Sequence, residues 1–291
     1  MEYAALNNGV VMPKLGYGVF QLDPEECERC VSDALGLGYR LIDTAQSYGN
    51  EEAVGAAIAR SGVPRGEIFL GTKVWIGNYG YEECRESVFE SLRKLKTDYL
   101  DLCILHQPFS DIFGAYRALE DLYEEGILKA IGISNFTPDR MIDVVSFSRI
   151  KPQVNQVEIH PFRQLKQAKK WHDKYGVQLQ AWGPYGQGKS GIFSLPVLVE
   201  IGERYGKSAA QVIARWHLQR DLVLIPKSTK AERMKENIDV FDFSLSEEEM
   251  DAIAGLDREG EARFAHADPA QTEFFVELAE QRKKPGQNLK K

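Results

Sequence analysis

Short apolar runs alternate with amphipathic segments along almost the whole chain. The runs are rich in Leu, Ile and Val, as buried strands are, and lie at residues 15–19, 40–43, 68–74, 100–105, 130–134, 154–158, 177–182 and 222–225. Between and after them, apolar residues recur at helical spacing. This spacing predicts helices over 24–37, 50–61, 81–95, 112–125, from 137 onward, and over 164–174, 195–205, 208–220, 231–237 and 246–256. The order of these elements predicts eight strand–helix units.

A hairpin signal precedes the eight units. Ala4 to Leu6 and Val10 to Met12 flank the turn residues Asn7-Asn8-Gly9. No linker or break in composition follows, which favours an α/β fold with one closed (β/α)8 TIM barrel over a doubly wound open sheet. The 291 residues then form one domain, because such a barrel needs roughly 250 residues. We expect two extra helices around the last unit and a solvated carboxyl-terminal tail over about 275–291.

The composition narrows the function classes. The formal net charge of −7 disfavours a protein that binds nucleic acid or an anionic membrane, because such a protein needs a basic face. The amino terminus lacks the pattern of a signal peptide, and no apolar run approaches the roughly 20 residues of a membrane span. Cys27 and Cys30 lie inside a predicted helix, where two unrelated thiols are expected rather than a redox motif. We therefore expect a cytoplasmic protein.

Ionisable side chains stand at or just after the carboxyl ends of three predicted strands. Asp43 ends one strand and Tyr48 follows it, Lys73 lies near the end of the next, and His106 follows the third. In parallel α/β folds this edge is where ligands bind. Each residue alone has an ordinary structural explanation, such as a helix cap, a surface ion pair or a core histidine. The convergence of all four at one edge favours a catalytic site.

The four side chains have complementary chemistry. A free tyrosine is a poor acid at neutral pH, but a neighbouring Lys73 ammonium favours the phenolate and should lower the pKa of Tyr48. Asp43 would keep Lys73 charged and oriented. Tyr48 could then protonate a developing alkoxide while His106 orients a carbonyl group. The set suits reduction of a carbonyl.

Reduction needs a hydride donor, and the last predicted strand carries a candidate nucleotide site. Lys227, Ser228 and Thr229 follow that strand, and Arg233 lies one turn into the next helix. Loops after the seventh and eighth strands of barrels often bind phosphate. Lys227, Ser228 and Arg233 offer charge and a hydroxyl donor to a phosphate dianion.

These segments together resemble the aldo-keto reductase superfamily along nearly the whole chain. The matching motifs are Asp43 to Glu51, Leu105-His106-Gln107-Pro108, Gly132 to Phe136, Val154 to Glu158 and Ile225-Pro226-Lys227-Ser228. The resemblance implies an (α/β)8 barrel whose bottom is closed by the amino-terminal hairpin. It also implies hydride transfer from NADPH to a carbonyl carbon without a metal.

Site residues follow from the resemblance position by position. Tyr48 matches the general acid, Lys73 and Asp43 the residues that tune it, and His106 the residue that orients the substrate. The remaining positions match the cofactor site. Ser134, Asn135 and Gln156 match the residues that bond to the nicotinamide carboxamide, and Trp182 matches the aromatic residue that stacks on its ring. Lys227, Ser228 and Arg233 would hold the 2′-phosphate, Glu236 and Asn237 would contact adenine, and Thr229 is a further cofactor-binding position.

Two positions depart from the pattern of many members. Gly183 stands where a serine is common, which removes a hydroxyl that could contact the cofactor. Gln107 stands where many mammalian members carry tryptophan, and the chain is more similar to prokaryotic members such as the 2,5-diketogluconate and glyoxal reductases. The resemblance also implies that Phe20, Trp75 and Gln107 line the pocket for a small carbonyl substrate.

Two other functions remain open at this point. A barrel metallohydrolase could use Asp43, His106 and His160, although the sequence has no paired-histidine metal motif. A non-catalytic NADPH-binding regulatory subunit, like the potassium-channel β-subunits, would keep the cofactor site. The family resemblance favours a monomer.

Overall fold

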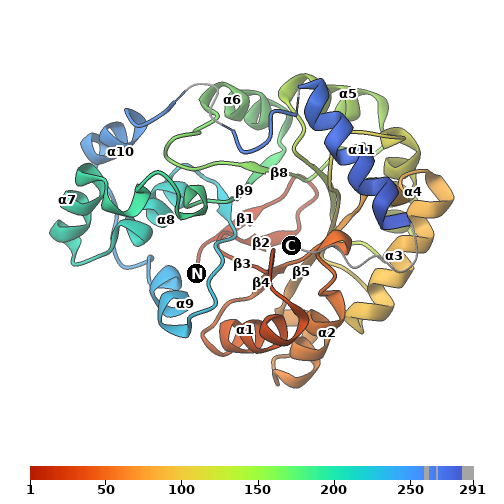
Figure 1. Cartoon of the computed structure of the whole chain (residues 1–291), viewed down its shortest axis with the longest axis horizontal. Helices are drawn as coiled ribbons and strands as arrows, with labels where there is room; N and C mark the ends of the chain where they lie inside the picture. The colour runs from red at the N-terminus through yellow and green to blue at the C-terminus, as the bar shows by residue number, and fades with distance from the viewer. Residues whose placement is uncertain (259–261, 267, 284–291) are drawn as a thin grey trace.

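The computed structural model describes residues 1–258, 262–266 and 268–283, and its centre is a barrel of eight parallel strands (Figure 1). The strands follow one another in chain order: β3 (Tyr17–Gly18), β4 (Leu41–Asp43), β5 (Phe69–Val74), β6 (Leu102–Leu105), β7 (Ile131–Ser134), β8 (Val154–Glu158), β9 (Gln178–Trp182) and β10 (Val223–Leu224). The first and last strands meet through a parallel bridge between Leu15 and Leu224. The Gly16 N–H donates to the Leu224 carbonyl at 2.9 Å, so the sheet closes on itself. The predicted barrel is confirmed.

The amino-terminal hairpin plugs one end of the barrel. Strands β1 (Tyr3–Ala5) and β2 (Val11–Pro13) pair antiparallel, as predicted. The Asn7 side-chain amide donates to the carbonyls of Pro152 and Gly176, both at 3.0 Å, and these residues precede β8 and β9. The hairpin therefore covers the amino-terminal ends of the strands. Its apolar side chains join those of the barrel interior: Ala4, Leu6, Met12, Leu41, Phe69, Leu102, Ile104, Ala130, Val154, Val223 and Ile225.

Helices surround the barrel: α1 (Pro24–Gly36), α2 (Glu51–Arg60), α3 (Tyr81–Leu95), α4 (Ile112–Glu124), α5 (Pro138–Phe147), α6 (Lys166–Tyr175), α7 (Pro196–Tyr205), α8 (Ala209–Gln219), α9 (Ala231–Ile238) and α10 (Glu247–Ala254). Local signals fix several of their starts. Asp23 accepts the Glu26 N–H at 2.9 Å with Pro24 at the first helical position. Ser208 and Gln211 form a capping box before α8. Cys27 and Cys30 are buried free thiols of α1.

The carboxyl-terminal segment differs from the prediction. A further helix, α11 (Pro269–Lys283, dark blue in Figure 1), occupies part of the expected tail, and Phe275 within it is buried. Phe275, Leu278 and Ala279 pack toward the core, whereas the neighbouring Phe274 and Val276 are exposed. The apolar residues thus lie on more than one face of the helix, and the tail was not recognised as helical. Residues 284–291, also expected in the tail, lie outside the described residues.

In the described part of the chain, no helix is both long and apolar enough to cross a membrane.

The hairpin plug gives a stability prediction. We expect Met12→Ala to lower the free energy of unfolding by about 2–5 kcal/mol, because Met12 is fully buried against the barrel interior and its loss leaves a cavity. Val11→Ala is the control, since the neighbouring Val11 side chain is 59% exposed and should change stability by about 0.5 kcal/mol or less. Urea unfolding of both variants measures the difference. Equal effects of the two substitutions would contradict the packing of Met12 into the barrel interior.

Candidate active site

The structure brings the four predicted catalytic side chains to the carboxyl-terminal edge of the barrel. Asp43 ends β4, and Lys73 lies in β5 directly before its last residue. Tyr48 ends η1 (Gln46–Tyr48), a short 3-10 turn after β4. His106 follows β6, and its N–H donates to the Val74 carbonyl at 3.1 Å. Adjacent parallel strands thus carry the set, as the sequence predicted.

Asp43 and Lys73 form an ion pair that is almost removed from solvent. Lys73 Nζ lies 2.6 Å from Asp43 Oδ2 and also donates to the Thr44 carbonyl at 2.8 Å, with 1% of its side chain exposed. The second oxygen, Asp43 Oδ1, accepts the Gln156 amide at 2.8 Å. Burial alone would lower the pKa of Lys73, but Asp43 and Tyr48 outweigh it and hold the pKa above the ordinary value. The lysine is therefore a fixed positive charge.

Tyr48 lies against this charge. Lys73 Nζ stands 4.9 Å from the centroid of the half-buried Tyr48 ring. Burial of the phenol raises the pKa of Tyr48 above its ordinary value of 10, and this effect exceeds the lowering by the Lys73 ammonium. The expectation of a lowered Tyr48 pKa was therefore wrong, because the sequence does not reveal how far the phenol is desolvated. The structure leaves Tyr48 protonated at neutral pH.

His106 completes the set beside Tyr48. The centroids of the His106 and Tyr48 rings are 5.7 Å apart, and the ring of Trp75 lies 5.5 Å from His106 in an edge-on contact. Ser47 Oγ is 3.3 Å from His106 Nδ1. Phe20 packs on Tyr48 with centroids 4.9 Å apart. Phe20 and Trp75, both predicted pocket residues, thus flank the predicted catalytic side chains.

The predicted carboxamide site is a connected polar group beside the catalytic residues. Asn135 has a left-handed backbone (φ 66°), and its amide nitrogen donates to the His106 carbonyl and to Ser134 Oγ, both at 3.1 Å. Asn135 Oδ1 accepts the Trp182 indole N–H at 2.9 Å. The Trp182–Asn135 bond fixes the ring expected to stack on nicotinamide, and nothing in the local sequence of either residue revealed it.

Gln156 connects this polar group to the ion pair. Its amide nitrogen, already bonded to Asp43, also donates to Gln180 Oε1 at 3.0 Å, and its backbone carbonyl accepts Ser134 Oγ at 2.8 Å. The predicted nicotinamide side of the site and the catalytic side therefore share one hydrogen-bonded network.

The predicted phosphate-binding segment presents two basic side chains that pair with no carboxylate among the described residues. Lys227 and Arg233 are exposed and form no ion pair with any residue that the structure describes. Ser228 is nearly buried, and its hydroxyl accepts the Lys230 N–H at 3.1 Å, while Thr229 is half-buried beside it. Unpaired cations beside a hydroxyl fit a phosphate dianion, so the donor set present suits the 2′-phosphate of NADPH.

Buried tyrosines hold this segment in place. The Tyr17 hydroxyl donates to the Ser228 carbonyl at 2.5 Å, and the Tyr39 hydroxyl donates to the Met234 carbonyl at 2.8 Å. Burial raises the pKa of both phenols, so they remain donors. Sequence reasoning missed these residues because each bond spans about two hundred positions of the chain.

The two positions expected at adenine already have partners within the protein. Glu236 accepts the Ser208 hydroxyl, and Asn237 Oδ1 accepts the Tyr185 hydroxyl at 3.0 Å. Tyr185 belongs to the loop after β9 that begins with Gly183, whose backbone is left-handed (φ 58°). Their contact with adenine stays a prediction.

Residues 262–266 and helix α11 lie beside the predicted site. Phe275 of α11 packs against Trp75, with centroids 6.3 Å apart, and against Phe109 at 5.7 Å. His266 stacks on Phe275, and its Nε2 lies 2.9 Å from Gln107 Oε1. Burial lowers the pKa of His266 to about 4, so the ring is neutral at physiological pH. Gln107, which was predicted to line the pocket, therefore forms a hydrogen bond with the segment that carries His266.

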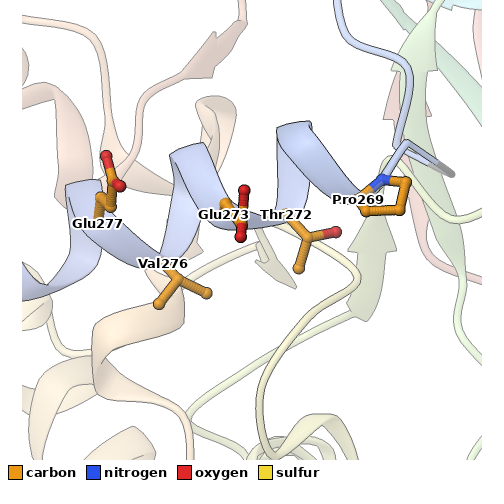
Figure 2. Close-up of a pocket in the computed structure, with 5 residues that line it drawn as sticks. All are labelled: Pro269, Thr272, Glu273, Val276 and Glu277. Carbon is orange, nitrogen blue, oxygen red and sulfur yellow. The ribbon is translucent and has the colours of Figure 1, made fainter.

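Along α11 itself, Figure 2 shows a hollow that is separate from this site. It is lined by Pro269, Thr272, Glu273, Val276 and Glu277. None of these residues belongs to the predicted site, and the two carboxylates offer nothing to an anionic cofactor.

The residues of the metallohydrolase alternative are not grouped as metal ligands. In the described residues no three His, Cys, Asp or Glu side chains are placed to hold a metal ion. His160 Nε2 instead lies 3.5 Å from Glu158 Oε1.

Comparison with known proteins agrees with this geometry. Residues 12–258 match the model of the aldo/keto reductase family. A glyoxal reductase of Bacillus subtilis is 45% identical over 256 residues, which cover 87% of this chain and 92% of that protein. A methylglyoxal reductase of Escherichia coli is 40% identical over 256 residues with the same coverage. A variant of the protein Gox0644, solved in complex with NADPH, has a TM-score of 0.87 at 35% identity and covers 91% of this chain and 97% of that chain.

A family model that spans most of the chain, and relatives that match along the same length, place the chain in the aldo/keto reductase family.

Proposed function

We propose that the chain is an NADPH-dependent reductase of small aldehydes, ketones and dicarbonyls. The observation that carries this proposal is the buried Lys73–Asp43 ion pair beneath Tyr48, with His106 on the same edge. The names of the relatives, a glyoxal reductase and a methylglyoxal reductase, support small dicarbonyls as the substrate class.

NADPH would lie between two groups of residues. Lys227, Ser228 and Arg233 would hold its 2′-phosphate, with Thr229 beside them. Ser134, Asn135 and Gln156 would bond to its carboxamide, beside Trp182. When bound, it supplies a hydride. The unpaired charges of Lys227 and Arg233 favour NADPH over NADH, which lacks the additional phosphate.

The protein's own residues would supply the proton that the reaction needs. The carbonyl carbon gains the hydride, and the Tyr48 hydroxyl transfers its proton to the developing alkoxide, so the product is an alcohol. The raised pKa of Tyr48 keeps this proton in place at neutral pH. Lys73 favours the phenolate that remains after transfer, and Asp43 keeps Lys73 charged. His106 would orient the carbonyl oxygen toward Tyr48.

The non-catalytic regulatory subunit is the less favoured alternative. All four catalytic side chains are present and in contact at one edge, and the two relatives above are named as reductases. We further propose a cytoplasmic monomer, in keeping with four cysteines that are buried and unpaired.

We expect Tyr48→Phe to lower kcat for NADPH-dependent reduction of methylglyoxal by about 10²–10⁴-fold, the usual contribution of a general acid. NADPH binding, measured by fluorescence titration, should remain nearly unchanged. Tyr116→Phe is the matched control, because the Tyr116 hydroxyl bonds to the Ile150 carbonyl at 3.1 Å away from this site. Undiminished turnover in Tyr48→Phe would refute the proposed acid.

We expect Lys227→Ala or Arg233→Ala to raise the KM for NADPH about tenfold or more, because each change removes a charge-assisted contact with the 2′-phosphate. The KM for NADH should change much less. Lys235→Ala is the control, since this lysine is also exposed on α9 but outside the proposed contact set. Steady-state kinetics with both cofactors measure the effect. Equal increases in the KM for NADPH and for NADH would contradict the assignment of Lys227 and Arg233 to the 2′-phosphate.

A further inference from the structure

We propose that Gln180 is a positioning residue for the cofactor, because it fixes the side-chain amide of Gln156 so that the amide oxygen is presented to the nicotinamide carboxamide. This inference rests on the proposed function, since it concerns how the same site would hold NADPH. Gln180 lies in β9, and no motif of the sequence singled it out.

Gln156 and Gln180 lie side by side inside the barrel. They are register partners on the parallel strands β8 and β9, and Gln180 is also the register partner of Val223 in β10. Register partners on parallel strands point to the same face of a sheet. Val223 belongs to the apolar interior of the barrel, so the two glutamines point there as well, and both are almost completely buried.

The chemistry of the neighbours fixes which way the Gln156 amide points. Its nitrogen lies 2.8 Å from Asp43 Oδ1 and 3.0 Å from Gln180 Oε1. Asp43 is paired with Lys73, and a carboxylate accepts hydrogen bonds but donates none. The Gln156 group that faces Asp43 is therefore the NH2 group. Both of its N–H bonds are used within the protein, one by Asp43 and the other by Gln180.

The oxygen of the same amide is left as an acceptor. Gln156 Oε1 receives no hydrogen bond from any group that the structure describes. A primary carboxamide such as that of nicotinamide carries an NH2 donor that suits this acceptor. The second bond, to Gln180, prevents the Gln156 amide from turning about its bond to Asp43, so the acceptor keeps one direction.

The amide nitrogen of Gln180 argues against a purely structural role. Because Gln180 turns its oxygen toward Gln156, its own NH2 group points away from Gln156. Gln180 Nε2 is buried and has no hydrogen-bond partner among the described residues. An apolar side chain at this position would leave one Gln156 N–H without an acceptor but would remove the unpaired NH2 group, so the two costs offset. Stability alone therefore does not favour glutamine here.

The test compares NADPH with its 3-acetylpyridine analogue, in which a methyl ketone replaces the carboxamide and removes the NH2 donor. The measured quantity is the ratio of the analogue Kd to the NADPH Kd, obtained from quenching of tryptophan fluorescence. We expect a ratio of about three to ten in the unmodified protein, the effect of one neutral hydrogen bond. Gln180→Met removes the acceptor that holds Gln156 and should bring the ratio close to one.

Two further variants separate positioning from packing. Gln180→Glu keeps an oxygen that can accept the Gln156 N–H, so it should retain a ratio near that of the unmodified protein. Gln178→Met is the matched control on the same strand, because the Gln178 amide donates to the carbonyls of Leu179 and Asp221, at 3.0 and 2.9 Å. It should leave the ratio unchanged. Urea unfolding should show Gln180→Met to be about as stable as the unmodified protein.

The outcomes distinguish this inference from the proposed function. An unchanged ratio in Gln180→Met, or failure of that variant to fold, would overturn the positioning role. A ratio in Gln178→Met as low as that in Gln180→Met would do the same. A ratio of one in the unmodified protein, with methylglyoxal still reduced by NADPH, would overturn this inference alone. Absence of NADPH binding by the unmodified protein would overturn the proposed function as well.

Discussion

The buried ion pair of Lys73 and Asp43 is the constraint on which the site depends. Removing two charges from water costs several kcal/mol per ion, and the protein offsets this only if the geometry and the additional hydrogen bonds are right. The Thr44 carbonyl and the Gln156 amide supply those bonds. Gln156 comes from β8, on the far side of the sheet order from β4, so the pair requires the closed barrel as well as its own two strands.

The sequence predicted the parts of the structure that depend on short segments. The cap at Asp23, the turn at Asn7-Asn8-Gly9 and the apolar strand runs are local signals, and the observed elements begin and end close to the expected residues. The catalytic set was also predictable, because parallel strands place their carboxyl ends at one edge. Asp43 and Lys73 needed no knowledge of distant packing.

The features that the sequence did not reveal depend on distant contacts. Helix α11 carries apolar residues on more than one face, and Phe275 is buried because Trp75 and Phe109 pack against it. The direction of the Tyr48 pKa depends on how much water its neighbours exclude, which residue types alone do not determine. The bond between Tyr17 and the Ser228 carbonyl likewise exists only once the barrel has closed.

The site therefore has two parts that are held in different ways. The proposed catalytic side chains lie at strand ends, which the hydrogen bonds of the barrel and the buried ion pair hold in place. A substitution there would therefore affect the fold as well as the reaction. Residues 262–266 and helix α11 lie beside the predicted site and are held by the Glu158–Arg263 and Gln107–His266 bonds and by aromatic packing. On the proposed function, substitutions in this segment would alter which carbonyl compound binds while Tyr48 and Lys73 keep their geometry. The substrate could then change without any change at the proposed acid.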